Sequence, residues 1–85
     1  MNNKLEIFKK KLIYRASYRG TKEMDMLLSQ FVNKYINLWD ELYLKELEEF
    51  LNYEDEVILN YYRDNIKRNG IEKNKISEIF KNFKI

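Results

Sequence analysis

The residue types best suited to recognition gather in one segment, residues 18–25, which reads YRGTKEMD. Arg19 supplies a permanently charged guanidinium, and Gly20 is one of only two glycines in the chain. Glu23 places a carboxylate three residues after that glycine. A glycine leaves its backbone uncovered, so another backbone or a planar ligand can approach closely, while one cation and one anion fix its orientation. Residues 18–25 therefore predict a recognition site.

The chain lacks the residue types on which most enzyme sites depend. It contains no cysteine, which excludes disulfides, thiolate metal sites and thiol nucleophiles. It also contains no histidine, so carboxylates such as Glu46, Glu49 and Asp55 cannot complete the Glu-x-x-His pairs of a di-metal bundle. We therefore expect no enzyme activity, no bound metal and no cofactor of its own.

Length and hydropathy place the chain among small globular proteins. Its 85 residues suffice for one helical domain, which we expect to span residues 1–85 around one modest core. No stretch approaches the roughly 20 apolar residues of a membrane helix, and the opening MNNKLEIFKKKL lacks the features of a secretory signal. We expect a monomer in the cytoplasm of a bacterium, with no insertion into a membrane.

Apolar residues recur at helical spacing along the whole chain, and no alternating pattern is long enough for a strand. The fold class is therefore predicted to be all-α, with about five short helices in a compact bundle. Apolar residues three and four positions apart form one stripe per helix, and these stripes are the predicted core. They comprise Leu5, Phe8, Leu12, Ile13 and Ala16; Met24, Leu27, Leu28, Phe31, Val32 and Tyr35; Tyr43, Leu44, Leu47, Phe50 and Leu51; Val57, Ile58, Leu59, Tyr61, Tyr62 and Ile66; and Ile76, Ile79, Phe80 and Phe83.

Polar residues mark where these helices begin and end. Thr21, Asp40, Asp55 and Asn74 each precede an apolar stripe and are predicted N-caps, because their side chains can accept hydrogen bonds from free backbone N–H groups. Gly70 follows the basic end of the fourth stripe and is predicted to stop that helix.

The net charge of +2 conceals two oppositely charged regions. Residues 1–22 sum to +6 and residues 40–56 to −7, while residues 23–39 and 57–85 sum to −1 and +4. Such an asymmetry can orient a partner electrostatically, and it can equally arise from solvated helix faces. Both interpretations stay open.

The basic N-terminal region also fits a different class of protein. Residues 9–11 (KKK), together with Tyr14, Arg15 and Arg19, combine basic and aromatic side chains as a small nucleic-acid-binding or antitoxin-like adaptor would. The acidic region of residues 40–56 would repel a phosphate backbone, however, so we expect no nucleic acid as partner. A generic helical adaptor is the other alternative.

Several features of the segment also have a structural explanation. Gly20 could simply end the first helix in a left-handed conformation. Arg19 and Glu23 could pair with each other, which contributes under ~1 kcal/mol if the pair is exposed. A tyrosine and arginine cluster at a helix end is a frequent protein anchor, so we place Tyr18 at an interface and leave Tyr14 open between interface and core cover.

The segment has the form R-G-x-x-E-[apolar]-D, and its surroundings extend the pattern. From about residue 12 to residue 62 the chain reads LIYRASYRGTKEMDMLLSQF, then an acidic helix ending ELEEFL, then EDEVILNYY. This layout resembles the succinate dehydrogenase flavinylation factors, the small FAD assembly factors often called SdhE. That family often has a proline near Glu56 and a tryptophan near Tyr61, and this chain has neither.

The resemblance implies a bundle of about five helices that binds the flavoprotein subunit of succinate dehydrogenase, with fumarate reductase as a second candidate. It implies that the chain promotes covalent attachment of FAD to a histidine of that subunit, by the flavoprotein's own chemistry. The motif positions are Arg19, Gly20 and Glu23, which with Tyr18 and Asp25 are the predicted partner-binding residues. In this family Gly20 would allow close approach, Arg19 would pair with an acidic group or carbonyls of the partner, and Glu23 would orient a partner side chain.

Overall fold

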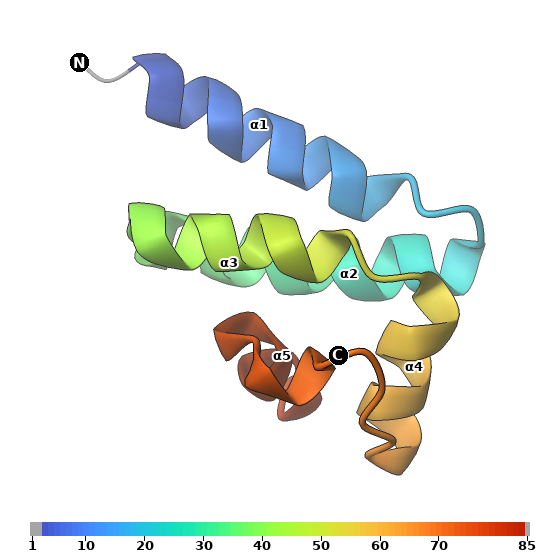
Figure 1. Ribbon diagram of the computed structural model, residues 1–85. Helices are drawn as coiled ribbons and strands as arrows, with labels where there is room; N and C mark the ends of the chain where they lie inside the picture. Colours follow the sequence, from blue (N-terminus) through green and yellow to red (C-terminus); the bar gives the residue numbers. More distant parts are fainter. Residues whose placement is uncertain (1–2, 85) are drawn as a thin grey trace.

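The all-α class is confirmed by the computed structural model, which describes residues 3–84 and has no strand among them. Within that range no helix is long and apolar enough to cross a membrane. Met1, Asn2 and Ile85 belong to the predicted domain range and lie outside the described residues. The helices in chain order are α1 (Asn3–Ser17), α2 (Lys22–Tyr35), the 3₁₀ helix η1 (Ile36–Leu38), α3 (Glu41–Leu51), α4 (Asp55–Asp64), the 3₁₀ helix η2 (Ile71–Lys73) and α5 (Lys75–Lys81) (Figure 1).

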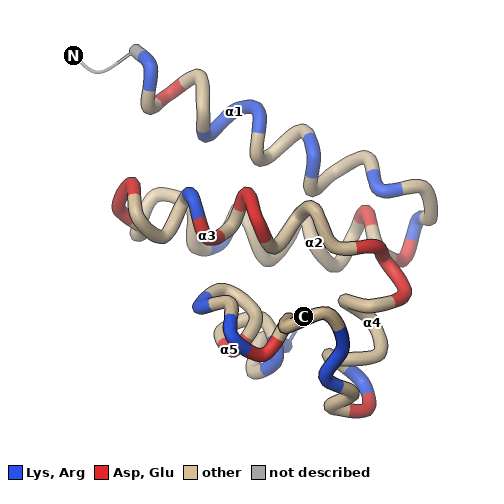
Figure 2. Tube along the Cα trace, in the orientation of Figure 1, with Lys and Arg blue, Asp and Glu red and all other residues tan. Residues whose placement is uncertain are grey.

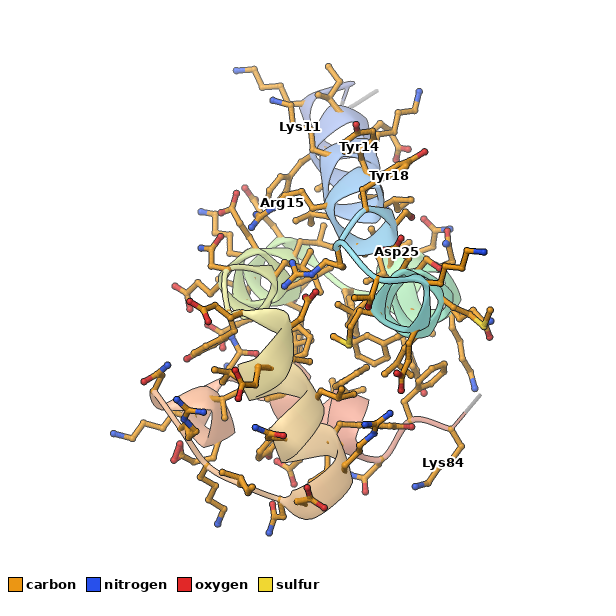
Figure 3. The ribbon with its side chains drawn as sticks, turned by 90° about the vertical axis from the view of Figure 1, so that its right-hand side faces the viewer. Lys11, Tyr14, Arg15, Tyr18, Asp25 and Lys84 are labelled. Atoms are coloured by element: carbon orange, nitrogen blue, oxygen red, sulfur yellow. The ribbon has the colours of Figure 1, made fainter. Side chains whose placement is uncertain are left out.

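Helices α1, α2 and α3 run side by side, and α1 packs against both of the others (Figures 1 and 3). Helix α4 turns away from this layer, and α5 packs against α3 and α4. The α1–α2 turn and the α3–α4 turn lie at the same end of the molecule, on the right of Figure 1. The fold therefore brings together two turns that are far apart in the sequence.

The core is centred on Phe31, a fully buried residue of α2. Its ring centroid lies 4.9 Å from that of Phe80, 5.3 Å from that of Phe83 and 5.7 Å from that of Trp39. The ring of Phe50 in α3 lies 6.5 Å away. Edge-to-face pairs of this kind contribute about 0.5–1.5 kcal/mol each beyond the burial of apolar surface. The cluster therefore holds α2, α3 and α5 in fixed relative positions.

Three of the four predicted N-caps are confirmed. Thr21 caps α2, Asp40 caps α3 and Asn74 caps α5, each by accepting a hydrogen bond from a backbone N–H two or three residues later. Each such cap contributes about 1 kcal/mol. Asn74 also donates from its amide to the Glu46 carbonyl at 2.9 Å, which ties the start of α5 to α3.

The limits of α4 differ from the prediction. Glu54, and not Asp55, is the N-cap residue, and its side chain makes no capping hydrogen bond. The helix also ends earlier, at Asp64, because Asn65 adopts a left-handed conformation with φ of 56°. Gly70, the predicted stop, instead precedes the 3₁₀ helix η2.

Two residues of the predicted core are exposed. Ile66 is 43% exposed because α4 has already ended before it. Tyr43 is 37% exposed on α3, and the Lys75 ammonium lies 5.8 Å from its ring centroid. Conversely, Ile36 in the 3₁₀ helix η1 and Ile71 in the 3₁₀ helix η2 are buried, although neither was in the predicted core. A search for the 3.6-residue period misses single buried residues in such short turns.

Candidate partner-binding site

The segment predicted to bind a partner begins with the turn between α1 and α2, residues 18–21, here called the RG turn. It connects Ser17, the last residue of α1, to α2, which Thr21 caps. Gly20 has a φ of +123°, which residues with a side chain rarely adopt, and the space that a Cβ would occupy is open. The backbone conformation therefore requires the glycine, and the turn presents uncovered backbone at the surface.

Asp25 holds the RG turn from the α2 side. Its Oδ1 atom accepts hydrogen bonds from the backbone N–H groups of Arg19 and Gly20, the second at 3.3 Å. Asp25 lies in the first turn of α2, where the helix dipole also favours a negative charge. The structure thus places this predicted partner-binding residue where it fixes the shape of the turn.

Arg19 points into the molecule and connects the RG turn to the α3–α4 turn. Its Nε donates to Asp55 Oδ1 at 2.8 Å, its Nη1 to the Leu51 carbonyl at 2.6 Å, and its Nη2 to the Tyr53 carbonyl at 2.7 Å. The Arg19 side chain is only 10% exposed. Leu51 is the last residue of α3, so the cation also meets the negative end of a helix. We call these three hydrogen bonds the Arg19 strut.

The Arg19 strut changes the interpretation of the motif arginine. The acidic group and the carbonyls that Arg19 was expected to find on a partner are supplied here by its own chain. Hydrogen bonds to a charged group contribute about 1.5–3 kcal/mol each, and the Arg19–Asp55 pair is partly buried, with side chains 10% and 28% exposed. The strut is therefore a strong local restraint between two turns at the same end of the molecule.

Glu23 points outward from the first turn of α2. Its carboxylate forms an ion pair with Arg63 of α4, and the two side chains are 58% and 53% exposed. Exposed pairs contribute at most about 1 kcal/mol, so a group on another protein can replace either residue at little cost. The two motif charges thus pair with different residues, Arg19 with Asp55 and Glu23 with Arg63, and not with each other.

Tyr14 and Tyr18 form an exposed aromatic pair next to the RG turn. Their ring centroids lie 4.5 Å apart, and the residues are 65% and 69% exposed. Tyr14 therefore does not cover the core. Arg15 points to the other side of α1 and donates to Asn52 Oδ1 just after α3, so it joins the two helices (Figure 3).

Comparison with known families decides where this arrangement belongs. Residues 10–84 match the family described as the flavinator of succinate dehydrogenase. The chain belongs to this family. The match includes the RG turn and the α3–α4 turn that the Arg19 strut connects. It confirms the resemblance seen in the sequence, and the flavinator family consists of succinate dehydrogenase assembly factors involved in flavinylation.

One relative of this chain is "Succinate dehydrogenase assembly factor 2, mitochondrial" of Scheffersomyces stipitis. The two sequences are 41% identical over 51 residues, which are 60% of this chain and 34% of the relative. The aligned part is thus about a third of the relative's length. No solved structure matches this chain.

The chain carries a surface groove of about 560 Å³ between α1 and α3. Its lining includes Lys4 and Leu5 from the start of α1, so it lies at the other end of that helix from the RG turn. The remaining lining residues are Phe8, Glu41, Lys45, Glu48 and Glu49. This mostly charged lining has no glycine-rich turn for a dinucleotide. Among residues 3–84, no three acidic side chains are placed to hold a metal ion.

Burial raises the pKa of the Tyr61 phenol in α4, and the carboxylates of Glu78 and Glu72 raise it further. The Lys81 ammonium lies 5.7 Å from the Tyr61 ring centroid. The phenol is therefore neutral at neutral pH and acts as a core residue. Tyr61 therefore packs between α4 and α5. The charges at the RG turn are those of the ion pairs described above.

Two residues of the site were not assigned to it by sequence reasoning. Asp55 was expected to cap α4, whereas its carboxylate accepts from Arg19. Arg63 lies within the predicted fourth helix and was given no role there, and it pairs with Glu23. The strong acidic charge of residues 40–56 was a signal that an arginine could find a partner there, but it did not indicate which carboxylate.

Proposed function

We propose that this chain binds the flavoprotein subunit of succinate dehydrogenase and promotes covalent attachment of FAD to it. The flavoprotein subunit of fumarate reductase is a second candidate partner. Membership of the flavinator family supports the process. One structural observation supports the mode of action: Arg19 fixes from inside a turn that exposes the Gly20 backbone, and the next helix exposes the Glu23 carboxylate in its first turn.

The proposal divides the work between the two proteins. This chain has no histidine or cysteine to supply as a nucleophile, and in this proposal the bond forms between FAD and a side chain of the flavoprotein. Correct positioning of reacting groups can lower a barrier by about 7–11 kcal/mol in favourable cases, and positioning needs no nucleophile on the positioning protein. The chain thus acts as an assembly factor with no catalytic residue of its own.

Two residues of the RG turn and two of the first turn of α2 have a role in this proposal. Gly20 lets a segment of the flavoprotein approach the backbone closely. Glu23 exchanges Arg63 for a basic or hydrogen-bonding group of the flavoprotein and so orients it. Arg19 and Asp25 hold the turn in the shape that the partner meets.

The compartment is part of the proposal as well. The relative carries the word mitochondrial in its name, whereas we expect this chain to act in the cytoplasm of a bacterium. In either place the partner is the flavoprotein subunit.

Gly20→Val tests the proposal against a purely structural role for the glycine. The substitution strains a backbone with φ of +123° and fills the approach surface. We expect affinity for the purified flavoprotein subunit, measured by calorimetry, to fall at least about tenfold, which is about 1.4 kcal/mol.

Gly70→Val is the matched control, because Gly70 also has a positive φ, of +76°, and open space at its Cβ position. It lies before η2, away from the RG turn. Gly70→Val should lower the melting temperature and leave the affinity unchanged. If Gly20→Val bound the flavoprotein as tightly as the wild-type chain, Gly20 would only end a helix.

A further inference from the structure

Helix α1 has apolar side chains on two opposite sides. Its inner side packs on α2 and α3 and includes the fully buried Leu12 and Ala16. Ile7, Tyr14 and Tyr18 are instead 53%, 65% and 69% exposed. Successive residues of a helix are about 100° apart, so a spacing of seven places Ile7 and Tyr14 on one side of α1. Tyr18, which directly follows the helix, lies on the same side, because its ring centroid is 4.5 Å from that of Tyr14. A helix that only had to cover the core would carry polar residues there.

The same side of α1 is basic. Lys10 and Lys11 lie between Ile7 and Tyr14 in the sequence, within about 60° of this line of exposed apolar residues, and both are exposed. The one carboxylate of α1, Glu6, falls about 100° away and pairs with Lys9 at 3.9 Å. Figure 2 shows this contrast as blue along α1 and red along α3 and the α3–α4 turn. We call Ile7, Lys10, Lys11, Tyr14 and Tyr18 the α1 outer face.

We infer that the α1 outer face is a docking surface for an acidic patch with an apolar centre on the flavoprotein subunit. The inference rests on the proposed function. The α1 outer face is continuous with the RG turn, because Tyr18 directly precedes Arg19. Its two adjacent tyrosine rings supply the apolar contact, and its lysines supply charge complementary to carboxylates.

The size of a stable interface supports this extension. Specific complexes bury about 800 Å² on each partner, which is more than a four-residue turn presents. Helix α1 has 15 residues and is therefore about 22 Å long. Together with the RG turn it offers a contact surface of the required extent. Figure 3 shows Tyr14 on α1 and Tyr18 just after it on the same side, with Arg15 directed to the other side of the helix.

The charges of the rest of the molecule favour a protein patch over an extended polyanion. Residues 40–56 carry a net charge of −7, and their helix α3 packs against α1. A nucleic acid or an anionic membrane extends beyond α1, and this acidic region would repel it over a Debye length of about 8 Å. An acidic patch of limited size would contact the lysines of the α1 outer face without reaching the acidic residues 40–56.

Binding of the full chain to the purified flavoprotein subunit, measured by calorimetry at low and at moderate salt, tests the inference. Tyr14→Ser/Tyr18→Ser should weaken binding at least about tenfold, as loss of interface aromatics does. Lys10→Glu/Lys11→Glu should weaken it by a similar factor at low salt and by less at moderate salt. Their melting temperatures should match that of the wild-type chain, because all four side chains are exposed. If a pair variant were unfolded, Tyr18→Ser alone and Lys11→Gln alone would replace it.

Two matched controls separate this surface from general effects. Lys67→Glu/Lys73→Glu changes the net charge equally at exposed positions after α4. Leu38→Ser/Leu42→Ser removes two apolar side chains that are 78% and 71% exposed on η1 and α3. Both controls should bind within about twofold of the wild-type chain, as variants outside an interface do.

The outcomes distinguish the two proposals. If the wild-type chain did not bind the flavoprotein, the proposed function would fail, and this inference with it. If Gly20→Val lost binding while both α1 outer face pairs kept wild-type affinity, the proposed function would stand and the inference would be wrong. The same double variants are also measured with phosphatidylglycerol vesicles and with duplex DNA. If they lost affinity for either of these and kept wild-type affinity for the flavoprotein, the inference would be overturned.

Discussion

Arg19 and Gly20 are adjacent residues with opposite surroundings. The Arg19 guanidinium is nearly buried and donates to three acceptors of the α3–α4 turn, whereas Gly20 stands at the surface with open space beside its Cα. The motif thus combines an internal restraint with an exposed backbone. Glu23 adds a negative charge at the surface. Its exposed ion pair with Arg63 can be broken at little cost in free energy.

Arg19→Lys tests the internal restraint at the residue scale. Lysine keeps the charge but has no planar fork, so at least one of the three acceptors loses its donor. We expect the free energy of unfolding to fall by about 2–4 kcal/mol, measured by urea unfolding followed by circular dichroism.

The control is Arg68→Lys, an exposed arginine in the loop before η2, which should change the free energy of unfolding by less than about 0.5 kcal/mol. An unfolding midpoint of Arg19→Lys equal to that of the wild-type chain would contradict the strut.

At the scale of elements, sequence reasoning succeeded where the determinants are local. The caps at Thr21, Asp40 and Asn74 depend on groups two or three residues apart, and all three were predicted correctly. The strut was not predicted, because Arg19 and Asp55 are 36 residues apart and no periodic pattern reports such a contact. The end of α4 was missed for another reason: Asn65 takes a left-handed conformation that sequence reasoning assigned to Gly70.

Asp55→Ala tests whether the α3–α4 turn controls the RG turn. The substitution removes the acceptor of Arg19 Nε, so the RG turn should open more often. The backbone N–H groups of Arg19 and Gly20 donate hydrogen bonds to Asp25. We expect their hydrogen exchange to become at least about tenfold faster, which corresponds to a loss of about 1.4 kcal/mol of local stability.

Asp64→Ala at the end of α4 is the control, since this exposed carboxylate lies at the unfavourable end of the helix dipole. It should leave the two exchange rates unchanged. Unchanged rates in Asp55→Ala would mean that the two turns are independent.

At the scale of the whole molecule, the charge asymmetry seen in the sequence becomes a spatial arrangement. The basic helix α1 packs beside the acidic helix α3, and the acidic α3–α4 turn lies next to the RG turn (Figure 2). The sequence predicted the class and most of the core, and it indicated residues 18–25 as a partner-binding segment, which stays a prediction. It could not separate the two roles of that segment, because whether a charge points inward or outward depends on the packing of distant helices.

The described part of the chain, residues 3–84, offers no cradle for a dinucleotide, so we expect the purified chain not to bind FAD by itself. Such a cradle needs a glycine-rich turn with the phosphates at a helix N-terminus, and the two glycines here are 50 positions apart, at 20 and 70. Calorimetric titration with FAD should give no saturable heat. Saturable one-to-one binding at micromolar affinity would make this chain a flavin carrier and would contradict a positioning role.

The most direct test of the account is covalent flavin formation in a mixture of purified apo-flavoprotein subunit, FAD and this chain. The fluorescence of the denatured flavoprotein band on a gel reports the bound flavin. We predict that the wild-type chain accelerates the appearance of this fluorescence. Glu23→Gln should remain folded and lose most of the acceleration, whereas Glu48→Gln, on the exposed face of α3, should keep it. Equal acceleration by Glu23→Gln and the wild-type chain, or none by the wild-type chain, would contradict it.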